Sequence, residues 1–474
     1  MTSFGRAPAD DATDAAPPPA GLFYGWVIVA VMAAVGALSM ALGSLNFGVF
    51  IKPMGDELGV GRAVFGWAQS SRQFASAVTA PVVGGLIDRF GVRVLMTVAA
   101  LTTGGALVCL AVVSEGWQIV ALFAIMGIVG MSGPGALVTS VPVTKWFVRQ
   151  RARALAYMSL GIPIGGLLFV PLTQVFIDAY GWRMAWVLLA LLGTGLIVPL
   201  SLIFVRREPE DLGLLPDGER RTPDATPQPV AREVGPVAPD DAKSGTDGER
   251  APSILIPSGT DDEVRERTRR REEVLREGER SWTRAEAVRS GTFWRLIFVF
   301  SIVMLATNSV GVHRIASFMD RGFDARLISY ATALDAAAAG LSTFAMGMLA
   351  RRVAPRYIGA GGFLMLMLAS ILTVLAETHL VMLLAMIVFG LGIGVLMLMQ
   401  NYLWAEYFGR RHLGSIRGAV TPITLLFGGA GPPIAGYVRD ATGSYTEVWL
   451  VAIVLMALGA VVMALTPPPR SDLV

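Results

Sequence analysis

The sequence is poor in charge, cysteine and histidine, and each shortage excludes a class of protein. Only 16% of the 474 residues are charged, against about a quarter in an ordinary soluble domain. The single cysteine, Cys109, excludes an internal disulfide. The three histidines lie far apart, without metal-ligand spacing. No Gly-x-Ser-x-Gly elbow or nucleotide fingerprint is present, so we expect no enzyme and no cofactor.

Long apolar segments are what the chain has instead. Hydrophobic residues make up 54% of it, and a helix crossing a bilayer needs roughly 20 of them in a row. Such windows occur at about 24–46, 64–87, 94–113, 118–144, 154–177, 184–205, 293–318, 327–349, 357–376, 380–405, 418–438 and 447–466. We therefore predict an all-α membrane protein with 12 transmembrane helices.

One hydrophilic insert separates the sixth window from the seventh. Of the 75 charged residues, 36 lie in 206–290, which is also rich in proline. Such a segment cannot bury enough apolar surface to fold alone. We expect a disordered tail (1–20), a six-helix bundle (21–205), a mostly disordered linker (206–290), a second six-helix bundle (291–466) and a short tail (467–474). Residues 282–287 are expected to form a short surface helix.

The distribution of lysine and arginine predicts the orientation in the membrane. These residues stay on the cytoplasmic side during insertion. One set of loops is rich in them, and it includes the linker. The opposite set holds only Lys52, Arg62, Arg183, Arg321, Arg326 and Arg439. We expect a multi-pass protein of the inner (plasma) membrane with both termini and the linker in the cytoplasm.

The two halves resemble each other. The segment that starts at Gly347 follows the eighth window as the segment that starts at Gly84 follows the second. In this comparison Arg351 replaces Asp88, and Ala354 replaces Gly91. The repeat predicts two pseudo-symmetric bundles. Glycine runs in the fourth and tenth windows are expected to let helices pack closely.

Two ionisable residues lie deep inside predicted helices. Arg72 is about nine residues into the second window, and Asp335 is about nine into the eighth. An intramembrane charge is costly unless it faces water or a partner, so it marks a functional site by default. Arg72 is a candidate contact for an anion, and Asp335 for a coupled proton, because burial favours the neutral carboxyl. The alternative is that each only closes a gate or satisfies a local hydrogen bond.

Further polar residues are candidates for the same site. Gln73, Asn308, Arg314 and Asn401 are expected to bind substrate, and His313 to carry or sense a proton. For His313 and Arg314 the competing interpretation is that each side chain extends to water at the membrane surface. For Asn401 it is a hydrogen bond to a neighbouring helix.

The segment that joins the second and third windows carries a specific motif. Its matching residues are Gly84, Leu86, Asp88, Arg89, Gly91 and Arg93. They resemble the signature loop between helices 2 and 3 of the major facilitator superfamily, a family of secondary transporters. The resemblance implies that Gly84, Asp88, Arg89, Gly91 and Arg93 act in the conformational change. Lys145 and Glu406 form a further matched pair, a candidate latch whose alternative is a solvated pair without a gating role.

Other local features resemble one branch of that superfamily. They include Phe23-Tyr24-Gly25-Trp26, Gly181-Trp182-Arg183, and Pro209 to Gly218. The series is similar to the prokaryotic monocarboxylate-transporter-like and oxalate/formate-antiporter-like branch. This implies transport of a small organic anion, often with a proton. Ala339 and Thr343 stand where animal carriers keep their charged pair, so Arg72 and Arg314 are expected to supply the cation.

Two other functions stay open. One is the export of hydrophobic or drug-like compounds, which the 21 methionines favour because flexible thioether surfaces accept varied ligands. The other is a transporter-fold receptor that signals through 206–290. For the transporter we expect a monomer in the lipid bilayer whose partners are a small organic anion and a proton, without nucleic acid.

Overall fold

The computed structural model describes residues 23–42, 44–128, 142–143, 146–147, 150–206, 282–350, 352–409 and 412–469. All regular structure within these ranges is helical, with no strand. Seven of the helices are long and apolar enough to cross a membrane. The prediction of an all-α membrane protein is confirmed.

The helices of the first bundle come from residues before the linker. They are α1 (Tyr24–Ala41), α2 (Ser44–Leu58), α3 (Arg62–Phe90), α4 (Val92–Leu110), α5 (Gly116–Ile128), α7 (Arg151–Ser159) and α8 (Gly161–Phe204). The second bundle contains α10 (Arg284–Arg289), α11 (Gly291–Asp320), α12 (Ala325–Leu349), α13 (Pro355–Leu375), α14 (His379–Phe408), α15 (Leu413–Thr442) and α16 (Thr446–Ala464).

The structure differs from the predicted windows in two places. The first window is two helices, α1 and α2, and the helical path continues to Leu58, well beyond residue 46. The fifth window begins in α7 and continues, together with the sixth, through one helical stretch, α8, in which only Gly181 is non-helical, with φ 77°. Glycine adopts this positive φ without steric cost, so a single residue is enough to turn the chain.

Each bundle has a hydrophobic core of its own. In the first, Phe50 stacks on Trp186 with ring centroids 3.7 Å apart. In the second, Phe300 packs edge-on against Phe363. A third, smaller cluster takes residues from both bundles, among them Val49 of α2 and Ile315 of α11. Two separate cores with a limited shared cluster suit two bundles that pack as distinct units.

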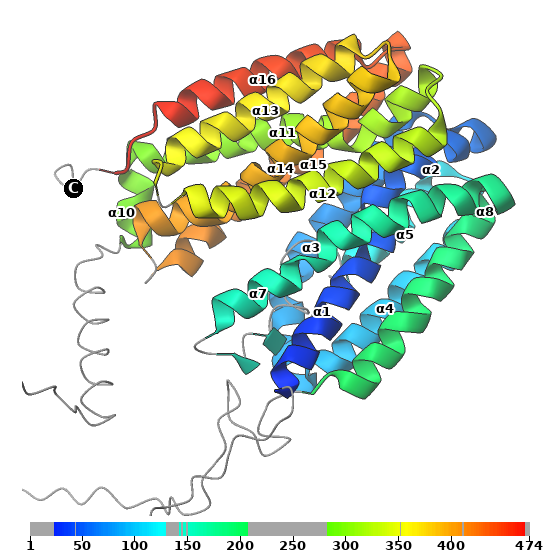
Figure 1. The fold of residues 1–474 in the computed structure, drawn as a ribbon, viewed down its shortest axis with the longest axis horizontal. Helices are drawn as coiled ribbons and strands as arrows, with labels where there is room; N and C mark the ends of the chain where they lie inside the picture. The colour runs from blue at the N-terminus through cyan, green and yellow to red at the C-terminus, as the bar shows by residue number, and fades with distance from the viewer. Residues whose placement is uncertain are drawn as a thin grey trace, which may run out of the picture.

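Among the helices that the structure describes, most contacts between the bundles come from three pairs: α3 with α15, α8 with α12, and α2 with α11. Figure 1 shows α8 and α12 meeting at one end of the molecule and diverging toward the other. We call the first the contact end; it carries the end of α2 and the starts of α3 and α12. The opposite end, where the described chain begins at Phe23 and stops at Pro469, is the terminal end.

Glycines allow α3 and α15 to touch. A Cβ on Gly66 would lie 2.4 Å from the carbonyl oxygen of Pro432. A Cβ on Gly436 would lie 2.4 Å from Cα of Ala63. Small residues at such crossings let two backbones approach more closely than side chains permit. The bundles are therefore in direct backbone contact along this pair.

The end of the linker is tied to the second bundle. The expected short helix is confirmed as α10, which starts with a capping box between Thr283 and Glu286. Just before it, Trp282 is buried, and its backbone N–H donates to the carbonyl of Phe408, 3.0 Å away. The tails 1–22 and 470–474 and the linker residues 207–281 lie outside the described residues.

Candidate functional site

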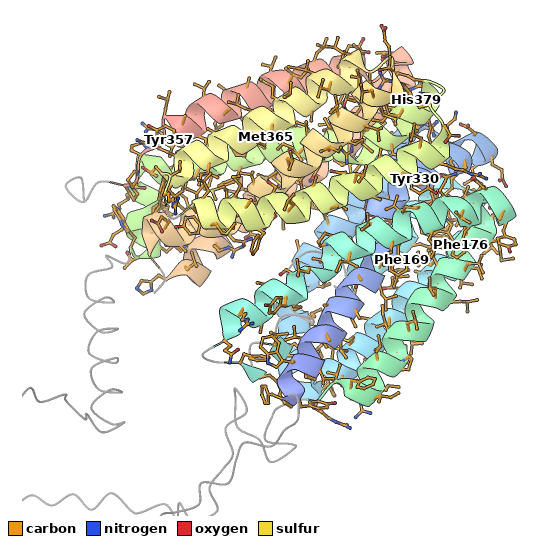
Figure 2. All side chains as sticks on the ribbon, viewed as in Figure 1. Phe169, Phe176, Tyr330, Tyr357, Met365 and His379 are labelled. Carbon is orange, nitrogen blue, oxygen red and sulfur yellow. The ribbon has the colours of Figure 1, made fainter. Side chains whose placement is uncertain are left out.

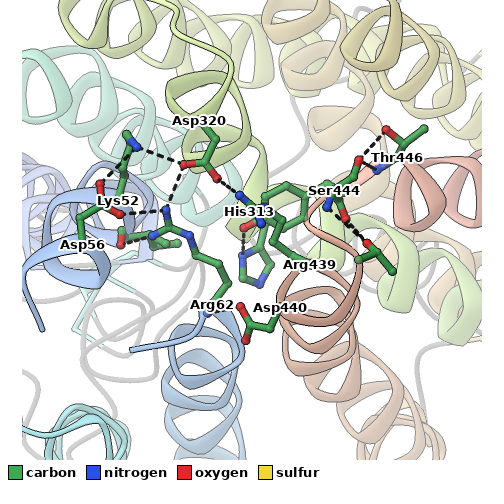
Figure 3. Close-up of polar contacts among 12 residues, drawn as sticks. Lys52, Asp56, Arg62, His313, Asp320, Arg439, Asp440, Ser444 and Thr446 are labelled. Atoms are coloured by element: carbon green, nitrogen blue, oxygen red, sulfur yellow. Dashed lines mark hydrogen bonds and ion pairs between the residues drawn. The ribbon is translucent and has the colours of Figure 1, made fainter. Parts of the chain in front are cut away.

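The contact end holds a cluster of charges, the contact-end cluster of Lys52, Arg62, Asp320, Arg439 and Asp440 (Figure 3). The carboxylate of Asp320 accepts from Lys52 Nζ at 3.4 Å, Arg62 Nη2 at 3.0 Å and Arg439 Nη2 at 3.3 Å. Lys52 and Arg62 belong to the first bundle, whereas Asp320 and Arg439 belong to the second. One carboxylate thus holds cations from both bundles.

Asp440 makes a second link in this cluster. Its carboxylate accepts the backbone N–H groups of Arg62 at 2.7 Å and Ala63 at 3.0 Å. These are the first residues of α3, whose N–H groups have no partner inside their own helix. A carboxylate there satisfies them and interacts favourably with the helix dipole. A helix of one bundle is therefore capped by a residue of the other.

A further ion pair joins α8 to α12 at the same end. Arg326 Nε lies 2.6 Å from Asp178 Oδ2. The arginine is the second residue of α12, and the carboxylate precedes Gly181 by one turn of α8. Together with the contact-end cluster, this pair links the two bundles at the contact end.

His313 lies in the second bundle beside this cluster and is fully buried. Its Nε2 is 2.8 Å from the carbonyl of Pro432, and its Nδ1 is 3.3 Å from the hydroxyl of Tyr445. A carbonyl only accepts, so Nε2 carries the proton. Burial raises the pKa of Tyr445, so its hydroxyl stays protonated and donates to Nδ1. The neutral imidazole is therefore satisfied on both sides, and the interpretation that it extends to water is wrong.

Arg314 and Asp335 form an ion pair inside the second bundle. Nη2 of the arginine on α11 donates to Oδ2 of the aspartate on α12, and both side chains are almost fully buried. The guanidinium also lies over the ring of Phe389 on α14, 3.8 Å from its centroid. Arg314 does not extend to the membrane surface, so that interpretation is wrong too. A buried pair of this kind is costly to break, because one partner is left as an uncompensated charge.

Arg72 lies in the first bundle and is 5% exposed. Its guanidinium is 6.0 Å from the ring centroid of Phe123 on α5. Among the contacts described, Asp335 is paired with Arg314 of its own bundle. The predicted roles of Arg72 and Asp335 stay predictions.

Gln73 and Asn308 come together at the junction of the bundles. Asn308 Nδ2 on α11 donates to the carbonyl of Gly428 on α15, 3.0 Å away. Gln73 Oε1 on α3 lies 4.0 Å from where a Cβ of that same glycine would stand. Two of the predicted substrate contacts thus meet at one turn of α15. Asn401 does not join them: it is exposed and donates to Met397 of its own helix at 3.0 Å.

The predicted gating residues lie at the terminal end. Gly91 turns the chain between α3 and α4 with φ 80°, and the side chains of Arg89 and Arg93 are exposed. Glu406 is also exposed. The side chain of Asp88, the surroundings of Gly84, and all of Lys145 lie outside the described residues. The roles of all these residues, including the latch between Lys145 and Glu406, stay predictions.

The contact-end cluster was not predicted as a unit. Its cations were noted only as sparse loop charges, and its carboxylates lie at helix ends where aspartate is ordinary. Asp440 is far from Arg62 in sequence, and no spacing rule connects them. Over the ranges the structure describes, no three His, Cys, Asp or Glu side chains lie close enough to hold a metal ion.

Comparisons with known proteins agree with this architecture. A family model described as the Major Facilitator Superfamily matches residues 29–432 and 315–473. Monocarboxylate transporter 13 of Bos taurus is 23% identical over 471 residues, which cover 96% of this chain and 91% of that protein. An uncharacterized MFS-type transporter, YcxA of Bacillus subtilis, is 24% identical over 35% of this chain and 40% of its own length.

Solved structures with the same fold are more distant in sequence. A bacterial homolog to the human lysosomal transporter Spinster, in an inward-facing and unoccupied conformation, has a TM-score of 0.65 at 14% identity. The match covers 94% of this chain and 97% of that one. A D-xylose-proton symporter has a TM-score of 0.64 at 13% identity, with 94% and 98% covered. With two helical bundles joined at one end and a family model that matches most of its length, the chain belongs to the major facilitator superfamily.

Proposed function

We propose that this protein is a secondary transporter that moves a small, monocarboxylate-like organic anion together with a proton by alternating access. The observation that carries the proposal is the buried pair of Arg314 and Asp335. It offers a fixed cation for a carboxylate and a carboxyl group for a proton, next to each other and shielded from lipid.

Charge balance couples the two ligands. The pair is neutral when both partners are ionised. If Asp335 takes up a proton, Arg314 is left as an uncompensated buried charge, which costs about 3–5 kcal/mol. An anion bound to Arg314 removes that cost. If an anion binds without the proton, the site carries an excess negative charge. Proton and anion are therefore favoured together, in equal number.

The contact-end cluster is proposed to be one of two alternating gates. Arginines with exposed side chains, such as Arg89, Arg93 and Arg417, lie at the terminal end, which favours a cytoplasmic position for that end. The contact end would then face the outside of the cell. When it is closed, the substrate would reach the site from the terminal end. Gln73 and Asn308, where the bundles meet, are proposed to contact the substrate. The full-length similarity to a protein named Monocarboxylate transporter 13 supports the substrate class.

Uptake into proteoliposomes tests the coupling. We expect wild type to accumulate a labelled monocarboxylate when an inward proton gradient is imposed. Asp335→Asn should lose gradient-driven accumulation by about tenfold or more and keep exchange at equal pH, because an amide stays neutral. Asp324→Asn is the matched control, since asparagine also caps α12. Unchanged gradient-driven accumulation in Asp335→Asn would exclude this proton site.

A substrate panel tests the anion. It should contain monocarboxylates, dicarboxylates, a neutral sugar and a hydrophobic cation. Arg314→Gln should reduce carboxylate uptake and leave any neutral substrate unaffected. Transport of the hydrophobic cation alone would instead support export of drug-like compounds.

A further inference from the structure

A groove opens between α8 and α12 at the contact end. Its volume is about 290 Å³, and its lining includes Gln174, Val175 and Asp178 from the first bundle and Arg326 and Tyr330 from the second. Figure 2 shows Tyr330 on α12 and Phe176 on α8 near where these two helices meet. The groove is thus built by both bundles at a level where helices end, which is the depth of lipid headgroups.

The inner wall of the groove has an unused hydrogen-bond acceptor. Gln174 is 3% exposed, and its Nε2 donates to Asp178 Oδ1 at 2.7 Å. No donor in the described part of the chain reaches its Oε1, which is buried. An unpaired buried carbonyl of this kind costs about 1–3 kcal/mol. A donor that enters the groove would remove this cost.

Both signs of charge stand beside this acceptor. Asp178 Oδ2 accepts from Arg326 Nε, while the arginine side chain remains 67% exposed. The side chain of Asp178 is 27% exposed, so the remaining lone pairs of its carboxylate can accept from a ligand cation, and the outer nitrogens of the guanidinium can donate to a ligand anion. A zwitterion fits this arrangement better than an ion of either sign, because it leaves the existing ion pair electrically balanced.

An apolar track continues from the groove toward the membrane interior. On α8 the exposed side chains are Val175, Leu168 and Ile164, and on α12 they are Tyr330, Leu334 and Leu341. Within each helix these residues are spaced by four or seven positions, which places them on one face. The groove therefore has a polar end at the headgroup level and an apolar path below it.

We propose that this groove binds an aminophospholipid from the leaflet at the contact end. Its ammonium group would donate to Gln174 Oε1 and Asp178, its phosphate would accept from Arg326, and its acyl chains would follow the two apolar faces. A choline headgroup has no N–H to donate, and a glycerol headgroup has no cation for Asp178. Because the binding residues come from both bundles, the lipid holds the contact end closed.

Native mass spectrometry of the purified full-length protein tests this with dioctanoyl lipids. Phosphatidylethanolamine should bind about tenfold more tightly than phosphatidylcholine, and each added N-methyl group should weaken binding as one N–H is lost. This series needs only the wild-type protein. Equal binding of the ethanolamine and choline lipids, or tighter binding of phosphatidylglycerol, would overturn the proposal.

Variants place the lipid in the groove. Gln174→Leu and Asp178→Asn should each abolish the preference for the ethanolamine headgroup. Arg183→Gln is the matched control, because this arginine forms an exposed ion pair with Glu57, 3.1 Å away, outside the residues that line the groove. A preference that survives in either groove variant, or that disappears in the control, would show that the lipid binds elsewhere.

Discussion

Arg72 and Asp335 occupy equivalent places in the two bundles, although their charges are opposite. A Cβ on Gly127 would lie 2.3 Å from the backbone carbonyl oxygen of Arg72. In the same way, a Cβ on Gly390 would lie 2.1 Å from the backbone carbonyl oxygen of Asp335. The same number of residues separates Arg72 from Asp335 and Gly127 from Gly390. The pairs α3 with α5 and α12 with α14 therefore cross in the same way, and the repeat seen in sequence is also a repeat in packing.

This relationship predicts that neither glycine tolerates alanine. A Cβ at Gly127 or Gly390 would overlap a carbonyl oxygen, so the helices must separate, at a cost of about 1–3 kcal/mol. We expect Gly127→Ala and Gly390→Ala to lower the melting temperature measured by scanning fluorimetry. Gly195→Ala is the control, because no described atom beyond the adjacent backbone of its own helix lies within 4 Å of its Cβ position. Equal stability of all three variants would contradict the close crossings.

The capping of α3 by Asp440 predicts a shift in gate opening. Asp440→Ala removes the acceptor for two N–H groups across the bundles, and loss of a cap costs about 0.5–2 kcal/mol. The state closed at the contact end should lose population by about 2- to 30-fold. This loss would be seen, in a protein whose exposed Cys109 is replaced by serine, as faster labelling of a cysteine placed at Val49, which is buried in the cluster shared by both bundles.

The control for that experiment is Asp324→Ala. Asp324 caps α12 from within its own chain segment, accepting from Leu327 at 2.8 Å. Its loss should destabilise the fold by a similar amount without favouring either state. If both variants accelerate labelling equally, Asp440 acts on stability alone and does not act as a gate.

Two of the three cations that contact Asp320, Lys52 and Arg62, are expected to contribute unequally to the stability of the closed contact end. Lys52 has a side chain 36% exposed, whereas that of Arg62 is 9% exposed. Exposed ion pairs contribute about 0–1 kcal/mol, but removing one partner of a buried pair costs more. Lys52→Ala should therefore leave labelling and transport nearly unchanged, while Arg62→Ala should open the contact end. The reverse order would contradict this description of the cluster.

Variants of the Arg314–Asp335 pair should separate its effect on stability from its effect on transport. Arg314→Met alone leaves a buried carboxylate and should destabilise the protein by about 3–5 kcal/mol. Arg314→Met combined with Asp335→Leu should recover most of that loss, because the two apolar side chains replace both charges. Transport should remain absent in the double variant. Recovered transport would mean that the pair is structural.

His313 is expected to position the gate without carrying the coupled proton. In His313→Gln the side-chain amide N–H can still donate to the carbonyl of Pro432, so the protein should still fold. Gradient-driven accumulation should persist, with at most a changed rate. If coupling is lost in this variant and retained in Asp335→Asn, then His313, and not Asp335, carries the coupled proton.

The helices, the family and two candidate site residues could be predicted from the sequence. The apolar windows predicted the helices because bilayer thickness fixes their length, and the Gly84 segment indicated the family. Arg72 and Asp335 were identified because a charge inside an apolar window is visible without coordinates. The path of α2 to Leu58 was missed, since beyond residue 46 it carries Lys52, Asp56 and Glu57, which break the apolar pattern.

Only the tertiary structure decided which residues form ion pairs and caps with one another. The sequence offered Asp335 as an isolated proton site and Arg314 as a separate anion contact, whereas the fold pairs them in a buried ion pair. It gave no sign that Asp440 caps a helix of the other bundle. The physical reason is that helix composition is set by the surrounding lipid, residue by residue, while a salt bridge or cap depends on how two distant helices cross.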